Sequence, residues 1–456
     1  MCDILLAMPD TTAKKTIVFG KNSDRPAGEC QVLSYSPGGP REPGDEIQCS
    51  YVSVPQTSPV LATIGCQPYW CWGYETGMNE AGVVGGNVAV FTRSLWDVVN
   101  GESLGLTGME LLRLGLERGH DAQETVGVIT DLLGEYGQWG SAVRGQDHRE
   151  GSYDNAFIVA DRHEAWVLET SGRRWVAERI TEGVRSISNE LSIRDQWTKG
   201  SADIRDFARD RGWWHPDNGQ FDFALAYSDH EHYPRQVSHI RRMRTEHLLD
   251  HYRGGIDVPT MMAMLRDHYE GSFLEGPQFH PFLPDFLTIC MHESPAGFTW
   301  GNTATSMVVE IDPADPVAPP CWVCYLPPCT GVYMAFPLSF LLPDTVTRAG
   351  TAGKGVWPAA EAPADGFSPV SLWWRFHRIV GAVRKDPLRR HKEVREVLDP
   401  LEQRYLKEVG EIMKGAPDSR NDKLDTLVQE EVSAVTGALE ALERRWNLTT
   451  EPIAEE

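Results

Sequence analysis

Two stretches near the start of the sequence decide the fold: Met1-Cys2-Asp3-Ile4-Leu5-Leu6-Ala7 and, after a second apolar run, Phe19-Gly20-Lys21-Asn22-Ser23-Asp24-Arg25-Pro26. Short apolar runs bounded by turn residues are typical of buried strands, so residues 2–8 and 15–19 are each predicted to form one. The polar segment 20–26 predicts a turn. A hairpin-like pair of strands would bring this segment back beside the start of the chain.

Cys2 is the first candidate for chemistry. Enzymes that remove an initiator methionine act when the second residue is small, and that step would leave Cys2 with a free α-amino group. The thiol is then a nucleophile, and the amine, with an ordinary pKa of about 7.7–8.0, can accept the thiol proton. A cysteine near a chain start means little by itself, so the prediction depends on its surroundings.

Three charged residues of the segment 20–26 can complete such a site. Asp24 could accept a hydrogen bond from the α-amine, and Lys21 or Arg25 would favour the thiolate by charge. Taken in isolation, the segment is better explained as a turn closed by a salt bridge.

Strand-like segments precede helical ones along much of the chain. Segment 82–91 and four segments within 155–188 are predicted strands, and 108–118 and 122–136 are predicted amphipathic helices. Residues 371–447 carry apolar side chains at helical spacing. Because βαβ alternation is scarce, the order predicts an α+β fold of antiparallel sheets covered by helices.

The chain divides into three predicted parts. Residues 1–345 form the core, and residues 346–369, rich in Gly, Ala and Pro, form a loop or linker. Residues 370–456 form a helical C-terminal extension that we expect to pack on the core.

The composition excludes several kinds of partner. The 456 residues carry 43 Lys and Arg against 65 Asp and Glu, a formal charge of −22. A nucleic-acid binder or a polybasic membrane-surface protein needs a basic face, so neither is expected. No apolar run approaches the roughly 18 residues of a membrane span, and the chain start does not resemble a signal peptide. We therefore expect a cytoplasmic protein whose nine cysteines are mostly reduced.

The start Met1-Cys2-Asp3, followed by the segment 19–26, resembles the C69 peptidase family, the dipeptidase and secernin group. Further segments agree in the same order: Gly77-Met78-Asn79-Glu80-Ala81-Gly82-Val83, Gly86-Asn87, Ser186-Ile187-Ser188-Asn189, Ile289-Cys290-Met291-His292 and Gly301-Asn302-Thr303-Ala304-Thr305-Ser306-Met307. Each segment alone is weak evidence, whereas the combination, over most of residues 2–335, is specific. The resemblance implies an N-terminal-nucleophile hydrolase, related to bile-salt hydrolases and penicillin V acylases, with a four-layer αββα sandwich.

The resemblance also implies roles for single residues. Cys2 matches the nucleophile, and Asp24 matches the acidic residue that contacts its amine. Asn87 matches an oxyanion-hole asparagine, and Asn189 a second asparagine near the nucleophile. Lys21 stands where bile-salt hydrolases have an arginine, so the charge is kept but the bidentate geometry is lost.

Four further residues are predicted to bind substrate: Arg25, Asn79, Arg241 and Arg242. The last two are candidates for the arginine that those hydrolases use late in the chain. A dipeptide presents a carboxylate, which an arginine can clamp bidentately.

The function implied is a cysteine dipeptidase that cleaves small peptides through a thioester on Cys2. Two alternatives stay open: an N-acyl-amide hydrolase or acyltransferase that uses the same nucleophile, and a non-enzymatic, secernin-like interaction protein. No metal or organic cofactor is implied, and the expected partner is a small peptide or amide. The resemblance alone favours a homo-oligomer.

Another group of cysteines has the spacing of a zinc or redox site. Cys321-Trp322-Val323-Cys324 is followed by Cys329, but a structural zinc needs four ligands and the sequence shows no second close pair with histidine. These thiols are therefore predicted to be buried and without a metal.

Overall fold

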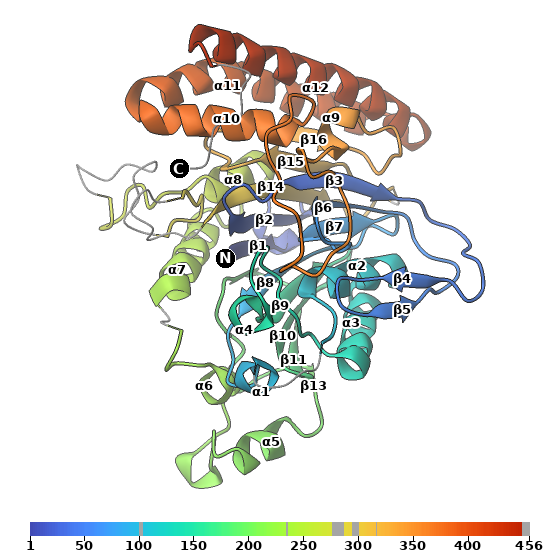
Figure 1. The fold of residues 1–456 in the computed structure, drawn as a ribbon, viewed down its shortest axis with the longest axis vertical. Coiled ribbons are helices and arrows are strands. Elements are labelled where there is room, and N and C mark those ends of the chain that lie inside the picture. Colours follow the sequence, from blue (N-terminus) through green and yellow to red (C-terminus); the bar gives the residue numbers. More distant parts are fainter. Residues whose placement is uncertain (100–103, 234–235, 276–286, 294–300, 316, 449–456) are drawn as a thin grey trace.

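The computed structural model describes residues 1–99, 104–233, 236–275, 287–293, 301–315 and 317–448. Two large antiparallel sheets form its centre (Figure 1). In spatial order, the first contains β12 (Val184–Ile187), β1 (Cys2–Ala7), β2 (Ile17–Pro26), β14 (Gly301–Ile311), β15 (Cys321–Tyr325) and β16 (Met334–Phe336). The second contains β13 (Lys199–Gly200), β11 (Arg174–Ile180), β10 (Ala165–Ser171), β9 (Asp154–Ala160), β8 (Val84–Val90), β7 (Thr76–Asn79), β6 (Thr63–Pro68) and β3 (Gln31–Ser36).

The start of the chain lies inside the first sheet. Cys2 is opposite Ser23 in the antiparallel pair of β1 and β2, so the predicted return of this segment to the chain start is confirmed. The turn predicted over residues 20–26 is wrong, because these residues continue β2, which pairs with β1 on one side and β14 on the other. A central strand tolerates this polar stretch because distant parts of the chain supply buried partners for its side chains.

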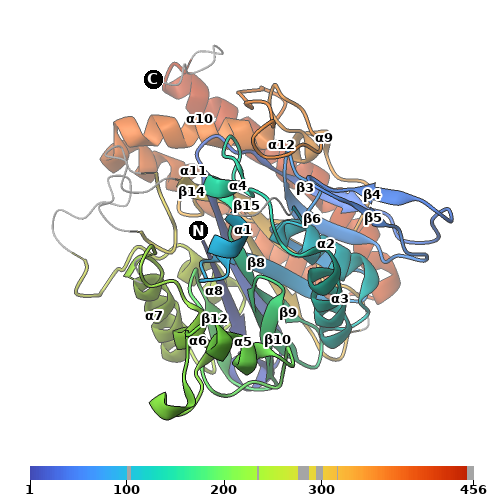
Figure 2. The same ribbon diagram turned by 60° about the horizontal axis from the view of Figure 1, so that its bottom comes forward.

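Helices cover the outer face of each sheet. The second sheet is covered by α2 (Gly108–Arg118) and α3 (Ala122–Tyr136), and the first by α7 (Gln236–His251) and α8 (Val258–Leu265). Figure 2 shows α2 and α3 on the opposite side of the strands from α7. The sheets face each other where β8 contacts β1 and β2. The predicted α+β class and four-layer αββα arrangement are therefore confirmed.

Three long helices form the top of the molecule in Figure 1: α10 (Leu372–Lys385), α11 (Pro387–Met413) and α12 (Arg420–Arg445). They pack on β15 and β16, and the buried Trp373 donates from Nε1 to Ala304 O at 2.9 Å. The preceding loop also follows the core, since Gly355 N donates to Tyr69 O at 2.9 Å. The division into three parts stays a prediction, and residues 449–456 of its last part lie outside the described residues.

Within the described ranges, no helix combines the length and the apolar character needed to cross a bilayer.

A titratable contact joins α12 to β16. Glu431 is fully buried and accepts a hydrogen bond from Ala335 N at 3.2 Å, and burial raises its pKa from 4.5 to about 8. The folded chain therefore keeps a proton that the unfolded chain releases. Glu431 therefore adds its whole contribution to the free energy of unfolding below pH 4.5. This contribution decreases as the pH rises and is lost above about pH 8.

Glu431→Gln should remove this part of the pH dependence, because a glutamine amide can accept the same hydrogen bond without ionising. Urea unfolding of both proteins at about pH 5 and about pH 8 measures the effect. We expect the free energy of unfolding to fall less in the variant than in the wild type. An equal fall in both would contradict the role of Glu431.

Candidate active site

The nitrogen of Cys2 is held by a side chain from a distant loop. Cys2 is 4% exposed, and its N–H donates to Asn189 Oδ1 at 2.9 Å. Asn189 follows β12, the strand beside β1, and its Nδ2 donates to Ala89 O at 2.7 Å, which fixes the orientation of the amide. The nitrogen that would become the α-amine on removal of Met1 therefore already has a positioned acceptor.

Arg241 of α7 contacts both Asn189 and Cys2. Its Nη2 donates to Asn189 Oδ1 at 2.7 Å, and its Nη1 donates to Cys2 O at 3.3 Å and to Asp3 Oδ2 at 2.6 Å. The Arg241 and Asp3 side chains are both fully buried, so the guanidinium holds Asn189 and Cys2 together inside the protein. The predicted binding of substrate by Arg241 stays a prediction, and the contacts in the structure are to Asn189, Cys2 and Asp3.

Asp24 lies on the other side of the chain start. Its backbone oxygen accepts from the Met1 amine at 2.9 Å, and Thr303 Oγ1 donates to its Oδ1 at 2.7 Å. Burial raises the pKa of Asp24 to about 7, against the opposing effect of the Met1 amine and Arg241. Burial also lowers the pKa of the Met1 amine. An amine at this place is therefore kept closer to its neutral, proton-accepting form.

Lys21 supplies the positive charge beside the thiol. Burial raises the pKa of the Cys2 thiol, and the Lys21 ammonium is the largest influence that opposes this rise. Lys21 Nζ is 3.0 Å from Glu75 Oε2 and 3.5 Å from Asn87 Oδ1, and it also donates to Glu75 O. Burial disfavours ionisation of Glu75, but Lys21 and Arg25 outweigh it and lower the Glu75 pKa.

Asn87 lies next to Lys21, on β8 of the facing sheet. Its Nδ2 donates to Asn155 Oδ1 at 3.1 Å, and its side chain is buried. The structure thus places Asn87 beside Lys21, near the start of the chain. Its role as an oxyanion donor stays a prediction.

Two residues that were predicted to bind substrate, Arg25 and Asn79, form hydrogen bonds or ion pairs with buried groups of the protein. Arg25 donates from Nε to Glu29 Oε1 at 2.7 Å and lies 3.2 Å from Glu75 Oε1, so it supports the partner of Lys21. Asn79 donates to Leu116 O and Gly119 O at 2.9 and 2.8 Å, at the end of α2. The Asn79 amide therefore anchors a helix end, and Asn79 does not line the cavity described below.

The absence of a side chain at Gly86 leaves room for the Lys21 side chain between the two sheets. A Cβ at Gly86 would lie 2.7 Å from Lys21 Cδ and 3.3 Å from Ile4 Cδ1. Gly86→Ala should therefore shift the ammonium, destabilise the fold by about 1–3 kcal/mol and reduce kcat/KM by about 10–100-fold.

Gly127→Ala is the matched control, because its added Cβ on α3 meets nothing within 4 Å. That change should stabilise the protein by up to about 1 kcal/mol and leave activity unchanged. Thermal unfolding and amide-hydrolysis assays on both variants test the pair. Full activity in Gly86→Ala would show that the position of Lys21 is unimportant.

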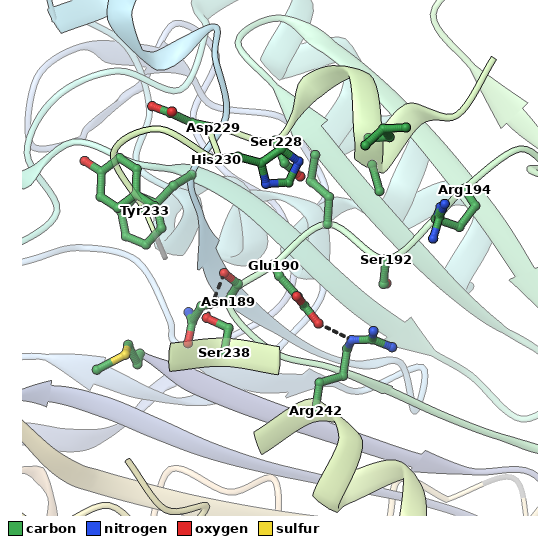
Figure 3. Close-up of a pocket in the computed structure, with 15 residues that line it drawn as sticks. Asn189, Glu190, Ser192, Arg194, Ser228, Asp229, His230, Tyr233, Ser238 and Arg242 are labelled. Carbon is green, nitrogen blue, oxygen red and sulfur yellow. Dashed lines mark hydrogen bonds and ion pairs between the residues drawn. The ribbon is translucent and has the colours of Figure 1, made fainter. Parts of the chain in front are cut away.

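A cavity of about 370 Å³ opens at the start of the chain (Figure 3). It is lined by Met1, Phe91, Asn189, Glu190, Leu191, Ser192, Arg194, Ala224, Leu225, Ser228, Asp229, His230, Tyr233, Ser238 and Arg242. Arg242 lies in this wall and pairs with Glu190 through its Nε at 2.5 Å, and its binding of substrate stays a prediction. Because Met1 is itself part of the lining, its removal would expose Cys2 to the cavity.

The sequence reasoning missed three residues of this centre: Asp3, Glu75 and Thr303. Asp3 and Thr303 belong to segments that carried the resemblance, and Glu75 lies two residues before another. Nothing local shows that their partners are Arg241, Lys21 and Asp24. These pairings join residues far apart in the sequence. They become visible only when the folded chain packs α7 on β1, pairs β2 with β14 and brings the two sheets face to face.

Comparison with known proteins gives a family match and distant structural neighbours. Among solved structures, the C2A mutant of conjugated bile acid hydrolase from Clostridium perfringens has 10% identity and a TM-score of 0.39, covering 71% of this chain and 89% of its own. Penicillin V acylase from Agrobacterium tumefaciens has 11% identity and a TM-score of 0.39, covering 74% and 88%. The N-acylethanolamine-hydrolyzing acid amidase ortholog of Caenorhabditis elegans has 11% identity and a TM-score of 0.28, covering 69% and 94%. Residues 74–275 match the model of peptidase family C69, the family that the sequence motifs resemble.

Proposed function

We propose that this protein is a cysteine dipeptidase whose nucleophile is Cys2, exposed as the N-terminal residue. The observation that carries the proposal is the bond between Cys2 N and Asn189 Oδ1, 2.9 Å long, at a chain start that lines a cavity. The match to a peptidase family supports hydrolysis of an amide bond. The more specific assignment to dipeptides rests on the lining of the cavity.

The residues present can perform each step of amide hydrolysis. The α-amine takes the thiol proton, and the sulfur attacks the carbonyl carbon to form a tetrahedral oxyanion. Lys21 favours the thiolate by charge, and Asn87 is the proposed donor to the oxyanion. The α-ammonium then protonates the leaving nitrogen, the C–N bond breaks and a thioester remains. Water hydrolyses the thioester while the amine again accepts a proton.

The cavity offers charges of both signs, as a free dipeptide requires. Arg194 and Arg242 can attract its carboxylate, and Glu190 and Asp229 can attract its ammonium group. A volume of about 370 Å³ is at the small end for ligand sites, which favours a small substrate.

One observation favours the alternative of an N-acyl substrate. Phe91 and Tyr233 stack in the cavity wall with ring centroids 4.0 Å apart, and they offer an apolar face to an acyl chain. An N-acyl-amide hydrolase or acyltransferase would use the same nucleophile and differ in what this wall binds.

Intact-mass analysis and a substrate panel test the proposal together. The mass should show that Cys2 is the first residue, and unblocked dipeptides should be cleaved at least about tenfold faster than their N-acetylated forms, because an acetyl group removes the ammonium charge. Preference for N-acyl amides would favour the alternative. No turnover of any amide by the processed chain would favour the non-enzymatic interaction protein.

A further inference from the structure

Two histidines and two cysteines meet in a buried cluster outside the cavity described above: His268, Cys290, His292 and Cys329. His268 follows α8, Cys290 and His292 precede β14, and Cys329 follows β15. All four residues are buried, with exposed fractions of 6% or less. One ligand atom from each, the histidine nitrogens and the cysteine sulfurs, lies within 4.8 Å of every other.

The distances within the cluster match the edges of a tetrahedron around a metal ion. His268 Nε2 is 3.2 Å from His292 Nε2, and the sulfurs of Cys290 and Cys329 are 3.7 and 3.2 Å from the same nitrogen. Zinc bonds of about 2.0–2.1 Å to nitrogen and about 2.3 Å to sulfur give tetrahedral edges of about 3.3–3.8 Å. These three separations are close to the edges of a Cys₂His₂ zinc site, and the other ligand atoms lie within 4.8 Å of one another.

Hydrogen bonding explains the same contacts less well. His268 Nδ1 faces Glu270 Oε1 at 3.0 Å, so the other ring nitrogen, Nε2, is the one that points into the cluster. His292 Nε2 lies near His268 Nε2 and two sulfurs at once, although an imidazole nitrogen forms a hydrogen bond along only one direction in the ring plane. A cation accepts a lone pair from each of the four atoms.

The surroundings of His268 are those of a metal ligand. The carboxylate of Glu270 holds the outer nitrogen of the ring, and its other oxygen accepts from His268 N at 2.6 Å, which turns Nε2 toward the cluster. Tyr269, between them, has φ 69°, a left-handed conformation that is costly for a non-glycine residue. The strained turn brings His268 and its carboxylate partner together.

We propose that His268, Cys290, His292 and Cys329 bind one zinc ion in a closed, structural site. Two thiolates and two neutral imidazoles around Zn²⁺ give no net charge, which suits a buried position. Four protein ligands leave no open position for a substrate. Spacing alone grouped Cys329 with Cys321 and Cys324, whereas the structure places it beside Cys290 and His292, a close pair that the sequence-based prediction did not include.

The ion would join three parts of the molecule that meet beside the candidate active site. Met291, between two of the ligands, donates from N to Thr303 Oγ1 at 3.0 Å, and Thr303 in turn donates to Asp24. Cys329 O accepts from His391 Nε2 at 3.0 Å and from Arg395 Nη1 at 3.2 Å, both on α11. The site therefore connects the support of Asp24 to the C-terminal helices.

Elemental analysis of the purified full chain, grown with added zinc, tests the proposal directly. We expect about one zinc per chain in the wild type and at least about tenfold less in Cys290→Ser and in Cys329→Ser. Cys324→Ser is the matched control, because Cys324 is also buried on the nearby β15 but lies outside the cluster. It should keep the metal.

Two measurements on the wild-type chain keep the test valid if a serine variant fails to fold. Cobalt added after removal of zinc should give the visible absorption of a tetrahedral site and a thiolate-to-cobalt charge-transfer band. Chelation should lower Tm, and added zinc should restore it. The proposal is overturned by wild-type protein without bound metal after zinc addition, by equal zinc in Cys290→Ser and Cys324→Ser, or by a Cys290–Cys329 disulfide in the non-reduced protein.

Discussion

Replacing Cys2 with alanine is expected to abolish amide hydrolysis and to leave the fold intact. The side chain contributes a single buried sulfur at the beginning of β1, and Asn189 would still hold the backbone nitrogen. Removing the nucleophile of a covalent mechanism typically costs about 10⁴-fold or more in kcat, far beyond any effect of a shifted side chain. Initial rates on the preferred dipeptide, with Tm as the measure of folding, give the result.

Two further variants separate loss of the nucleophile from loss of a buried thiol. Cys2→Ser keeps the geometry and an α-amine, but its hydroxyl is a weaker nucleophile, so we expect an activity between those of the alanine variant and the wild type. Cys49→Ala removes an equally buried sulfur from the core between the second sheet and its helices, and should keep full activity. Retained activity in Cys2→Ala would move the nucleophile elsewhere and end the proposal.

Local sequence signals predicted most of the regular elements. The bounds predicted for α2 and α3 agree with the structure, because these helices carry their own start signals: Thr107 and Glu110 form a capping box before α2, and Asp121 caps α3. The pairing of the chain start with residues 21–25 was also correct. The conformation of these segments is determined by residues that lie close to them in the sequence.

The polar segment 20–26 shows where local reasoning fails. Gly20, Pro26 and the charged residues between them are typical of a turn, yet β14 pairs with them from almost 300 residues away. Separation along the sequence also explains why some residues of the candidate active site were predicted and others were not. The motif placed Lys21 and Asp24 beside the chain start, where the structure has them, and their catalytic roles stay predictions. The buried ion pair of Arg241 depends on the packing of α7 against β1 and β12.

The proposed zinc site is a second case in which sequence spacing alone was not enough. Its ligands are separated by intervals that match no common zinc motif, since Cys290 and His292 are two residues apart and the other two lie on distant loops. Spacing rules detect sites in which close pairs come from one hairpin or helix. A site assembled from three separate loops is visible only after the sheet has brought the loops together.

Arg241→Met is expected to be the most destabilising single change considered for this protein. Arg241 and Asp3 form an ion pair, 2.6 Å long, between two fully buried side chains. Removing one partner of such a pair leaves an uncompensated charge and typically costs about 3–5 kcal/mol of unfolding free energy. Arg253→Met is the matched control, because Arg253 lies just after α7, forms an exposed pair with Asp250, and its replacement should cost at most about 1 kcal/mol.

The double variant Asp3→Leu/Arg241→Met separates the charge from the positioning role. With both charges replaced by apolar groups, we expect most of the lost stability to return in urea unfolding. Activity should not return, because Asn189 Oδ1 has still lost the guanidinium that fixes it beside the Cys2 nitrogen. A double variant no more stable than Arg241→Met would show that the ion pair is not the source of the loss, and recovered activity would show that Arg241 does not position the site.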